Sequence, residues 1–113
     1  MSKELSVTLV LGDVAEGKMR SCRVGGREIV VCHTKAGIFA LDNICTHAYA
    51  RLDEGRLRGT RLICPLHGAS FDVRDGRVLG APATRPLATH TVSVIGDRIE
   101  ISLSPADSKQ LIL

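Results

Sequence analysis

The sequence is poor in aromatic residues and has no strong concentration of charge. It contains no Trp, one Tyr and two Phe, so it lacks the row of aromatic side chains on which single-stranded nucleic acids stack. Fifteen Lys and Arg against twelve Asp and Glu give a net charge of +3, and no run of like charges concentrates it. This balance is too mild to indicate nucleic-acid binding.

Long apolar segments are also absent. No stretch approaches the roughly 18 consecutive apolar residues that a membrane-spanning helix needs, and Lys or Arg recurs throughout. The first residues show neither a long apolar region nor a small-residue cleavage site, so no leader peptide is indicated. We therefore expect a cytoplasmic protein with no membrane contact. In that reducing compartment, cysteines at 22, 32, 45 and 64 favour metal or catalytic roles over disulfides.

The arrangement of apolar and turn residues predicts an all-β chain. The 113 residues fit a single domain, 1–113. Short runs of β-forming residues are separated by turn residues too closely for a helix of ordinary length to fit between them. From about 42 to 86 glycines recur and apolar runs shorten, which predicts a loop-rich segment. The expected strands are 6–10, 19–24, 27–33, 38–41, 56–58, 61–63, 70–73, 89–95 and 98–103.

Two similar motifs lie in the loop-rich segment. The first is Cys45-Thr46-His47, and the second is Cys64-Pro65-Leu66-His67. A structural zinc site also takes two Cys and two His, but common zinc motifs pair like ligands at short spacing, whereas each loop here mixes them. Mixed loops favour a site with two metal ions. If the loops approach as near mirror images, Cys45 and Cys64 converge on one iron, and His47 and His67 on a second.

This ligand set resembles that of the Rieske [2Fe–2S] family, in which two His replace two Cys on one iron. Gly68 and the segment Ala81-Pro82-Ala83 also match the family, whose proline-containing loop covers the cluster. The resemblance implies a Rieske fold: an antiparallel β-sandwich base with a loop-rich cluster-binding subdomain at about 42–86. It implies one [2Fe–2S] cluster bound by Cys45, His47, Cys64 and His67, with a covering role for Pro82.

The sequence departs from the high-potential branch of that family at four positions. Ala50 and Leu66 stand where that branch has the two Cys of a disulfide joining the loops. Ala69 and Phe71 stand where it has a Ser and a Tyr that donate hydrogen bonds to sulfur. Because such bonds stabilise the reduced form, their absence implies a reduction potential near the lower end for Rieske centres, about −150 mV.

The resemblance implies an electron carrier and not an enzyme, since 113 residues leave no place for a second, catalytic iron site. We expect a monomeric ferredoxin that takes electrons from an NAD(P)H-dependent flavoprotein reductase. It would deliver them to a terminal oxygenase that hydroxylates aromatic compounds. One alternative is the small subunit of an assimilatory nitrite reductase. A structural zinc or interaction module is a further alternative, and it would be colourless and redox-silent.

Partner docking is expected at the tip formed by His47 and His67, near Pro82 and Tyr49, with a modest contribution from Arg51. Six Arg against five acidic residues between 42 and 80 predict no strongly charged docking face and moderate sensitivity to salt. The remaining candidate side chains receive structural roles. Cys22 and Cys32 are expected to be buried, His33 and His90 to be exposed or hydrogen-bonded at the surface, and Phe39, Phe71 and Tyr49 to pack in the core or against loops.

Overall fold

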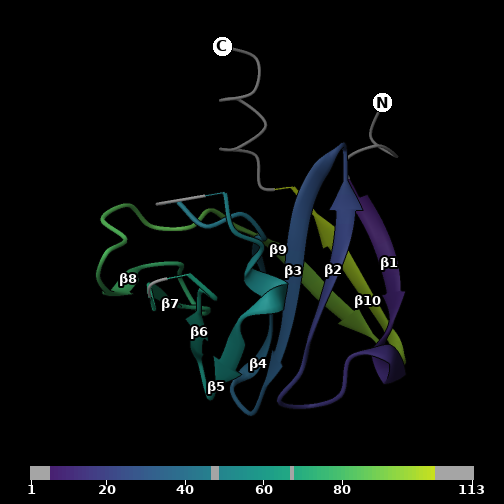
Figure 1. The fold of residues 1–113 in the computed structure, drawn as a ribbon. Helices are drawn as coiled ribbons and strands as arrows, with labels where there is room; N and C mark the ends of the chain where they lie inside the picture. Colours follow the sequence, from purple (N-terminus) through teal and green to yellow (C-terminus); the bar gives the residue numbers. More distant parts are fainter. Residues whose placement is uncertain (1–5, 47–48, 67, 104–113) are drawn as a thin grey trace.

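The computed structural model describes residues 6–46, 49–66 and 68–103, and within these ranges the chain is built from β-strands and two short 3-10 helices (Figure 1). The expected strands are all present with bounds that agree to within one or two residues. The structure adds a strand that the sequence did not predict, β8. The elements are β1 (Ser6–Val10), η2 (Leu11–Asp13), β2 (Met19–Val24), β3 (Arg27–Thr34), β4 (Gly37–Asp42), η3 (Leu52–Glu54), β5 (Arg56–Arg58), β6 (Arg61–Ile63), β7 (Ser70–Asp72), β8 (Val78–Gly80), β9 (Thr89–Ile95) and β10 (Arg98–Ser102).

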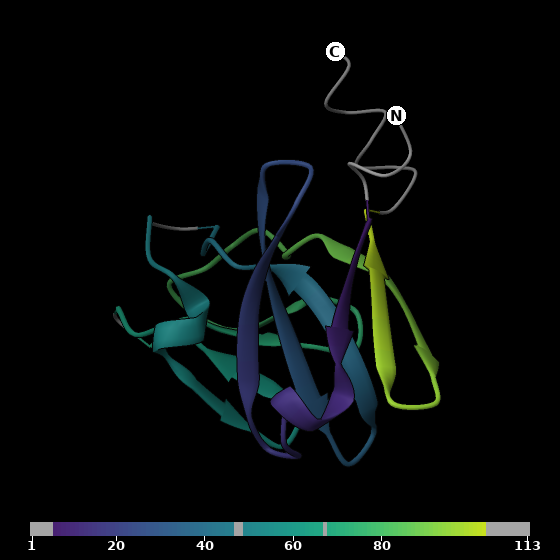
Figure 2. The ribbon, with the colours of Figure 1, turned by 90° about the vertical axis from the view of Figure 1, so that its right-hand side faces the viewer.

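The base of the molecule is an antiparallel six-stranded sheet in the order β1-β10-β9-β4-β3-β2. Its halves are joined by only two residue pairs between β4 and β9, so the sheet curls into a barrel-like shape (Figure 2). The Gly25–Gly26 turn joins β2 and β3 as expected, with both glycines at positive φ. The interior of the base is filled by aliphatic side chains, most of them β-branched: Val14, Val24, Ile29, Val31, Ala40, Ile99, Ile101 and Leu103.

A smaller four-stranded sheet, β5-β6-β7-β8, lies beside the base (Figure 1). Its inward face presents Leu62 and Phe71, which are directly paired across β6 and β7 and are fully buried. These two side chains belong to a second apolar cluster that also contains Cys45 and Cys64. The small sheet therefore forms one wall of the region that contains the two motifs. No helix in the described ranges is long and apolar enough to cross a membrane.

Candidate metal centre

The two motifs lie on loops with the same pattern of backbone hydrogen bonds. In the first loop the Cys45 N–H donates to the Ala50 carbonyl (3.0 Å), and in the second the Cys64 N–H donates to the Ala69 carbonyl (2.7 Å). Outside each hydrogen bond comes a bridged residue pair, Ile44 with Arg51 in the first loop and the β6–β7 pair of residues 63 and 70 in the second. Each Cys thus begins a six-residue loop closed at its neck.

The structure brings the two cysteines together. Cys45 is 4% exposed and Cys64 is 2% exposed, neither forms a disulfide, and their side chains are within hydrogen-bonding contact. Burial raises the pKa of the Cys64 thiol and the adjacent Cys45 raises it further, while the backbone N–H of Leu66 acts in the opposite direction. Two buried sulfurs in hydrogen-bonding contact can both coordinate one metal ion. Such an ion would displace the thiol protons, and its positive charge would balance the two thiolates.

The other two predicted ligands, His47 and His67, lie outside the described residues. Described residues close to them in sequence show how exposed each loop is. Tyr49 is fully exposed and Leu66 is 45% exposed. Tyr49 therefore packs neither in the core nor against a loop, and its exposure agrees with the expected place near the surface of the first motif.

The proline-containing loop contacts the first motif through a reciprocal pair of hydrogen bonds. The Thr46 hydroxyl donates to the Arg85 carbonyl (2.8 Å), and the Arg85 guanidinium donates to the Thr46 carbonyl (3.3 Å). Ala83 is buried in the same apolar cluster as Cys45 and Cys64, while Pro82 itself is exposed. The loop is therefore anchored against the motif at two points, and the covering role expected of Pro82 stays a prediction. Sequence reasoning missed Thr46 and Arg85 because the pair is separated by 39 positions.

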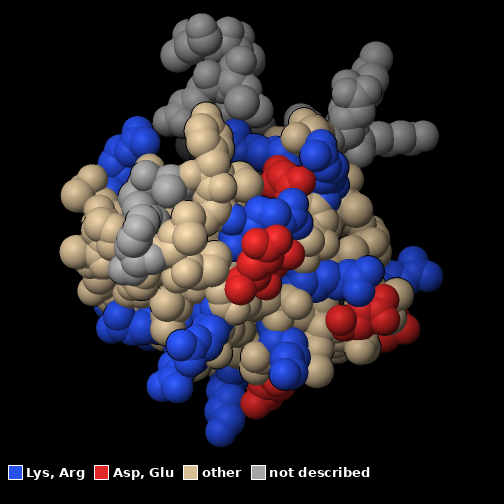
Figure 3. Space-filling view, viewed as in Figure 1, with Lys and Arg blue, Asp and Glu red and all other residues tan. Residues whose placement is uncertain are grey.

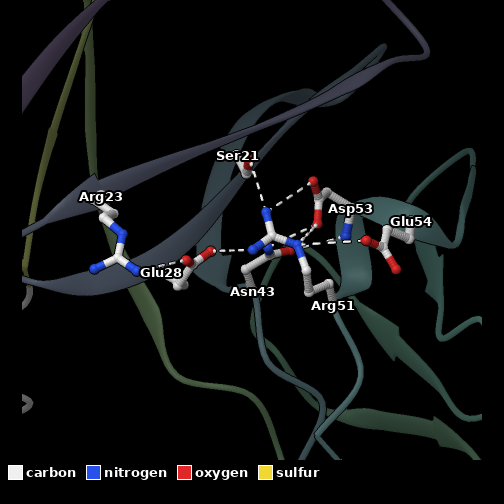
Figure 4. A network of polar contacts seen from close by, with 7 residues as sticks. All are labelled: Ser21, Arg23, Glu28, Asn43, Arg51, Asp53 and Glu54. Carbon is white, nitrogen blue, oxygen red and sulfur yellow. Dashed lines mark hydrogen bonds and ion pairs between the residues drawn. The ribbon is translucent and has the colours of Figure 1, made fainter.

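A polar network fixes the neck of the first loop to the base (Figure 4). The buried Asn43 side chain donates to the Asp53 carboxylate (2.8 Å) and accepts from the Asp53 N–H (2.9 Å), which ties the two ends of the loop together. Burial would raise the pKa of Asp53, but the hydrogen bonds from Asn43 and Arg51 outweigh it and hold that pKa below its usual range.

Arg51 is the central cation of this network. Its guanidinium pairs with Glu28 on β3 (3.0 Å) and with Asp53 (3.3 Å), and it also reaches Glu54 and Ser21. Arg51 is therefore paired within the chain, and the modest docking contribution expected of it stays a prediction. The signal for this network in the sequence was weak: polar residues flank the loop on both sides, but their partners come from distant strands.

Three other sequence expectations can be compared with the structure. Cys32 is fully buried, which raises its pKa to about 12, whereas Cys22 is only half-buried. The surface placement of His90 was wrong: its side chain is fully buried, and its Nε2 lies 2.9 Å from the Asp42 carboxylate, which also binds Arg27. His33 is partly buried with Nδ1 2.7 Å from the Val14 carbonyl, so it is hydrogen-bonded as expected.

Comparison with known proteins identifies this arrangement. Residues 6–91 match the Rieske [2Fe-2S] domain family. The chain belongs to that family. Among relatives, it is 38% identical over 104 residues to the "Naphthalene 1,2-dioxygenase system, ferredoxin component" of Pseudomonas aeruginosa, covering 92% of this chain and 100% of the relative. It is also 38% identical over 92 residues to the "Biphenyl 2,3-dioxygenase, ferredoxin component" of Rhodococcus jostii, covering 81% and 86% of the two chains.

Solved structures show the same Rieske fold. The ferredoxin of carbazole 1,9a-dioxygenase from Nocardioides aromaticivorans superimposes with a TM-score of 0.83 at 30% identity, covering 88% of this chain and 99% of that one. A second match, with a TM-score of 0.82, 30% identity and coverage of 88% and 94%, is a chain in a complex of oxygenase and ferredoxin in carbazole 1,9a-dioxygenase. Membership in the Rieske family implies one [2Fe–2S] cluster, and the convergent buried sulfurs of Cys45 and Cys64 fit its cysteine-bound iron.

Proposed function

We propose that this Rieske protein is a cytoplasmic one-electron carrier, the ferredoxin component of an aromatic-ring-hydroxylating dioxygenase system. It receives electrons from an NAD(P)H-dependent flavoprotein reductase and delivers them to a terminal Rieske non-haem iron oxygenase. The observation that carries this function is the contact between Cys45 and Cys64, which lie on two loops with the same backbone hydrogen bonds. The chain also aligns with a ferredoxin component over that relative's whole length. A carrier of this kind transforms no substrate itself, so the chain needs no catalytic residue.

The proposed ligands divide between two irons. Cys45 and Cys64 hold the inner iron, and His47 and His67 hold the outer one, all within a cluster-binding subdomain at about 42–86. The bound cluster supplies one reversible electron. Burial of both Cys side chains excludes water from the sulfur atoms, and the Leu66 N–H faces the Cys64 sulfur. The anchored proline-containing loop shields the same region through Ala83.

The relatives favour the carrier over the two alternatives. A structure titled as a putative nitrite reductase small subunit matches at 19% identity with a TM-score of 0.72, and a match at this identity is evidence for the fold alone. Three relatives that match at 37–38% identity over 82–92% of the chain are named as ferredoxin components. A zinc module does not agree with membership in the Rieske family.

A reconstitution assay tests this function. Purified reductase and oxygenase of the naphthalene dioxygenase system from Pseudomonas putida are mixed with NADH, naphthalene and this protein, and the dihydrodiol product is measured. We expect product formation that depends on the added protein and increases with its concentration. A preparation with a reducible cluster that neither accepts electrons from the reductase nor supports product formation contradicts the proposal.

A further inference from the structure

The outer face of the β5–β6 hairpin carries three arginines. Residues that are directly opposite on paired strands share a face, and Arg58 lies opposite Arg61, with Arg56 on the same face. The inward face carries Leu57 and Leu62, which pack toward the core. All three Arg side chains are exposed. Like charges directly opposite one another destabilise a sheet, so the fold bears a cost for holding Arg58 and Arg61 in register.

The neighbouring carboxylates are engaged with other arginines. Asp53 and Glu54 pair with Arg51. Asp72 lies opposite Arg61 on β7, but its carboxylate binds Arg74 at 2.7 Å and Arg77 at 3.4 Å instead. Within the described part of the chain, no carboxylate forms an ion pair with the three outer arginines. The near balance of charge in the sequence is therefore misleading, since the acids neutralise one group of arginines and leave another free.

Lys18 extends this positive surface. A hollow of about 390 Å³ lies between Lys18 and the β5 strand, and Arg56 and Arg58 line its other side. We refer to Lys18, Arg56, Arg58 and Arg61 as the basic flank. In Figure 3 blue side chains gather at the lower left, over the region where Figure 1 places β5 and β6, with few red ones between them.

Protection against aggregation explains only part of the flank. Exposed edge strands commonly carry charge to prevent edge-to-edge pairing, and β5 is an edge strand. That explanation covers Arg56 and Arg58. Arg61 belongs to β6, which is paired on both sides, and Lys18 precedes β2, so neither protects the β5 edge. Protection of the β5 edge therefore leaves Arg61 and Lys18 unexplained.

The basic flank adjoins the second ligand loop. Arg56 lines a second hollow, of about 340 Å³, together with Cys64, Pro65 and Gly68. Arg61 donates a hydrogen bond from its guanidinium to the Ser70 hydroxyl (2.8 Å), close to the end of the same loop. A molecule bound to the flank is thus held beside the loop that supplies a proposed iron ligand.

We propose that the basic flank docks an acidic surface of a redox-partner protein, an inference that rests on the proposed carrier function. Unpaired arginines on the outer face of a rigid hairpin attract carboxylates and increase the rate of encounter. A protein is favoured over a nucleic acid because the flank contains no aromatic side chain for stacking and lies against the cluster-binding loop. Docking is then steered by charge.

The test compares two double variants that change net charge equally. Arg56→Glu/Arg58→Glu reverses charge on the flank, while Arg20→Glu/Arg98→Glu reverses two exposed arginines on β2 and β10 of the base. Each protein is checked for an unchanged visible spectrum and midpoint potential. Stopped-flow rates of reduction by the naphthalene-system reductase and of oxidation by its oxygenase are then measured from low to high salt.

We expect the flank variant to lose about tenfold or more in the rate with at least one partner at low salt, and to lose most of the salt dependence. The base variant should change by less than about twofold. The docking role of the flank is overturned if the two variants have equal effects, or if neither has an effect while the wild type transfers electrons. Either result leaves the carrier function intact. A wild-type protein that transfers no electrons overturns both proposals. The proposal of a protein partner is overturned in favour of nucleic acid if the wild type binds a labelled 20-mer DNA duplex tightly at physiological salt and the flank variant does not.

Discussion

At the scale of single residues, the surroundings of the two cysteines determine which side chains can tune the cluster. Ala69 and Phe71 are both fully buried, and both belong to the apolar cluster that contains Cys45 and Cys64. Neither side chain can donate a hydrogen bond to sulfur. The two residues on which the expected low reduction potential depends therefore lie in the same buried region as Cys45 and Cys64.

Adding a hydroxyl at these positions should raise the potential. We expect Phe71→Tyr, and separately Ala69→Ser, to raise the midpoint potential by tens of millivolts, because about 1.4 kcal/mol of extra stabilisation of the reduced state corresponds to about 60 mV for one electron. Protein-film voltammetry measures the change. Val31→Thr is a matched control, since Val31 is equally buried but lies in the core of the base. A shift no larger than that of the control would exclude hydrogen bonding as the reason for a low potential.

At the scale of elements, the turn between β7 and β8 is stabilised by a buried carboxylate. Asp72 is 2% exposed, and it accepts hydrogen bonds from the Arg74 side chain and from the Arg74 N–H. The Arg74 hydrogen bonds, with additional attraction from Arg77, lower the pKa of Asp72 to about 2. Because the folded pKa lies below the unfolded one, the stabilisation is present above about pH 4 and is lost as pH falls towards 2.

Removing this carboxylate should therefore destabilise the protein in a pH-dependent manner. We expect Asp72→Asn to lower the free energy of unfolding by about 1–2 kcal/mol at pH 7, after allowing for screening at the exposed Arg partners. The deficit should shrink between pH 4 and pH 2. Urea unfolding at several pH values measures it, with Asp75→Asn as a control, because Asp75 is exposed and its carboxylate lies 3.9 Å from Arg77. A deficit that is the same at pH 7 and pH 3 would contradict the role given to Asp72.

The comparison of sequence and structure shows which elements local patterns determine. Alternating strands such as β1 and β10 were predicted to within one residue, because their burial follows the period of the strand. β8 was missed because it is three residues long and forms only by pairing with β7 across a register shift. The burial of His90 was missed because it depends on Asp42, 48 positions away. Neither the Thr46–Arg85 contact nor the pairing of charges could be predicted, since both depend on tertiary structure.

At the scale of the whole molecule, a barrel-like base supports a small sheet and two loops that share the same backbone hydrogen bonds. The loops bring two buried sulfurs together, the Asn43–Asp53 pair closes the neck of the first loop, and the proline-containing loop is anchored against it. Charge is distributed unevenly around this centre, because paired arginines brace the loops and turns, while three arginines without an ion pair among the described residues share one face of the β5–β6 hairpin. The proposed docking flank is therefore distinct from the arginines that brace the loops and turns.

The most direct test of this arrangement is metal analysis combined with EPR of the reduced protein for the wild type and three single variants. The wild type and Cys22→Ser, which changes a cysteine outside the motifs, should each contain two irons and two sulfides per chain and give a rhombic signal. Cys64→Ser and His67→Ala should contain no cluster and give no signal, since each iron needs both of its protein ligands. Full iron content and an unchanged rhombic signal in either of these two variants, or zinc in place of iron in the wild type, would contradict the proposed metal centre.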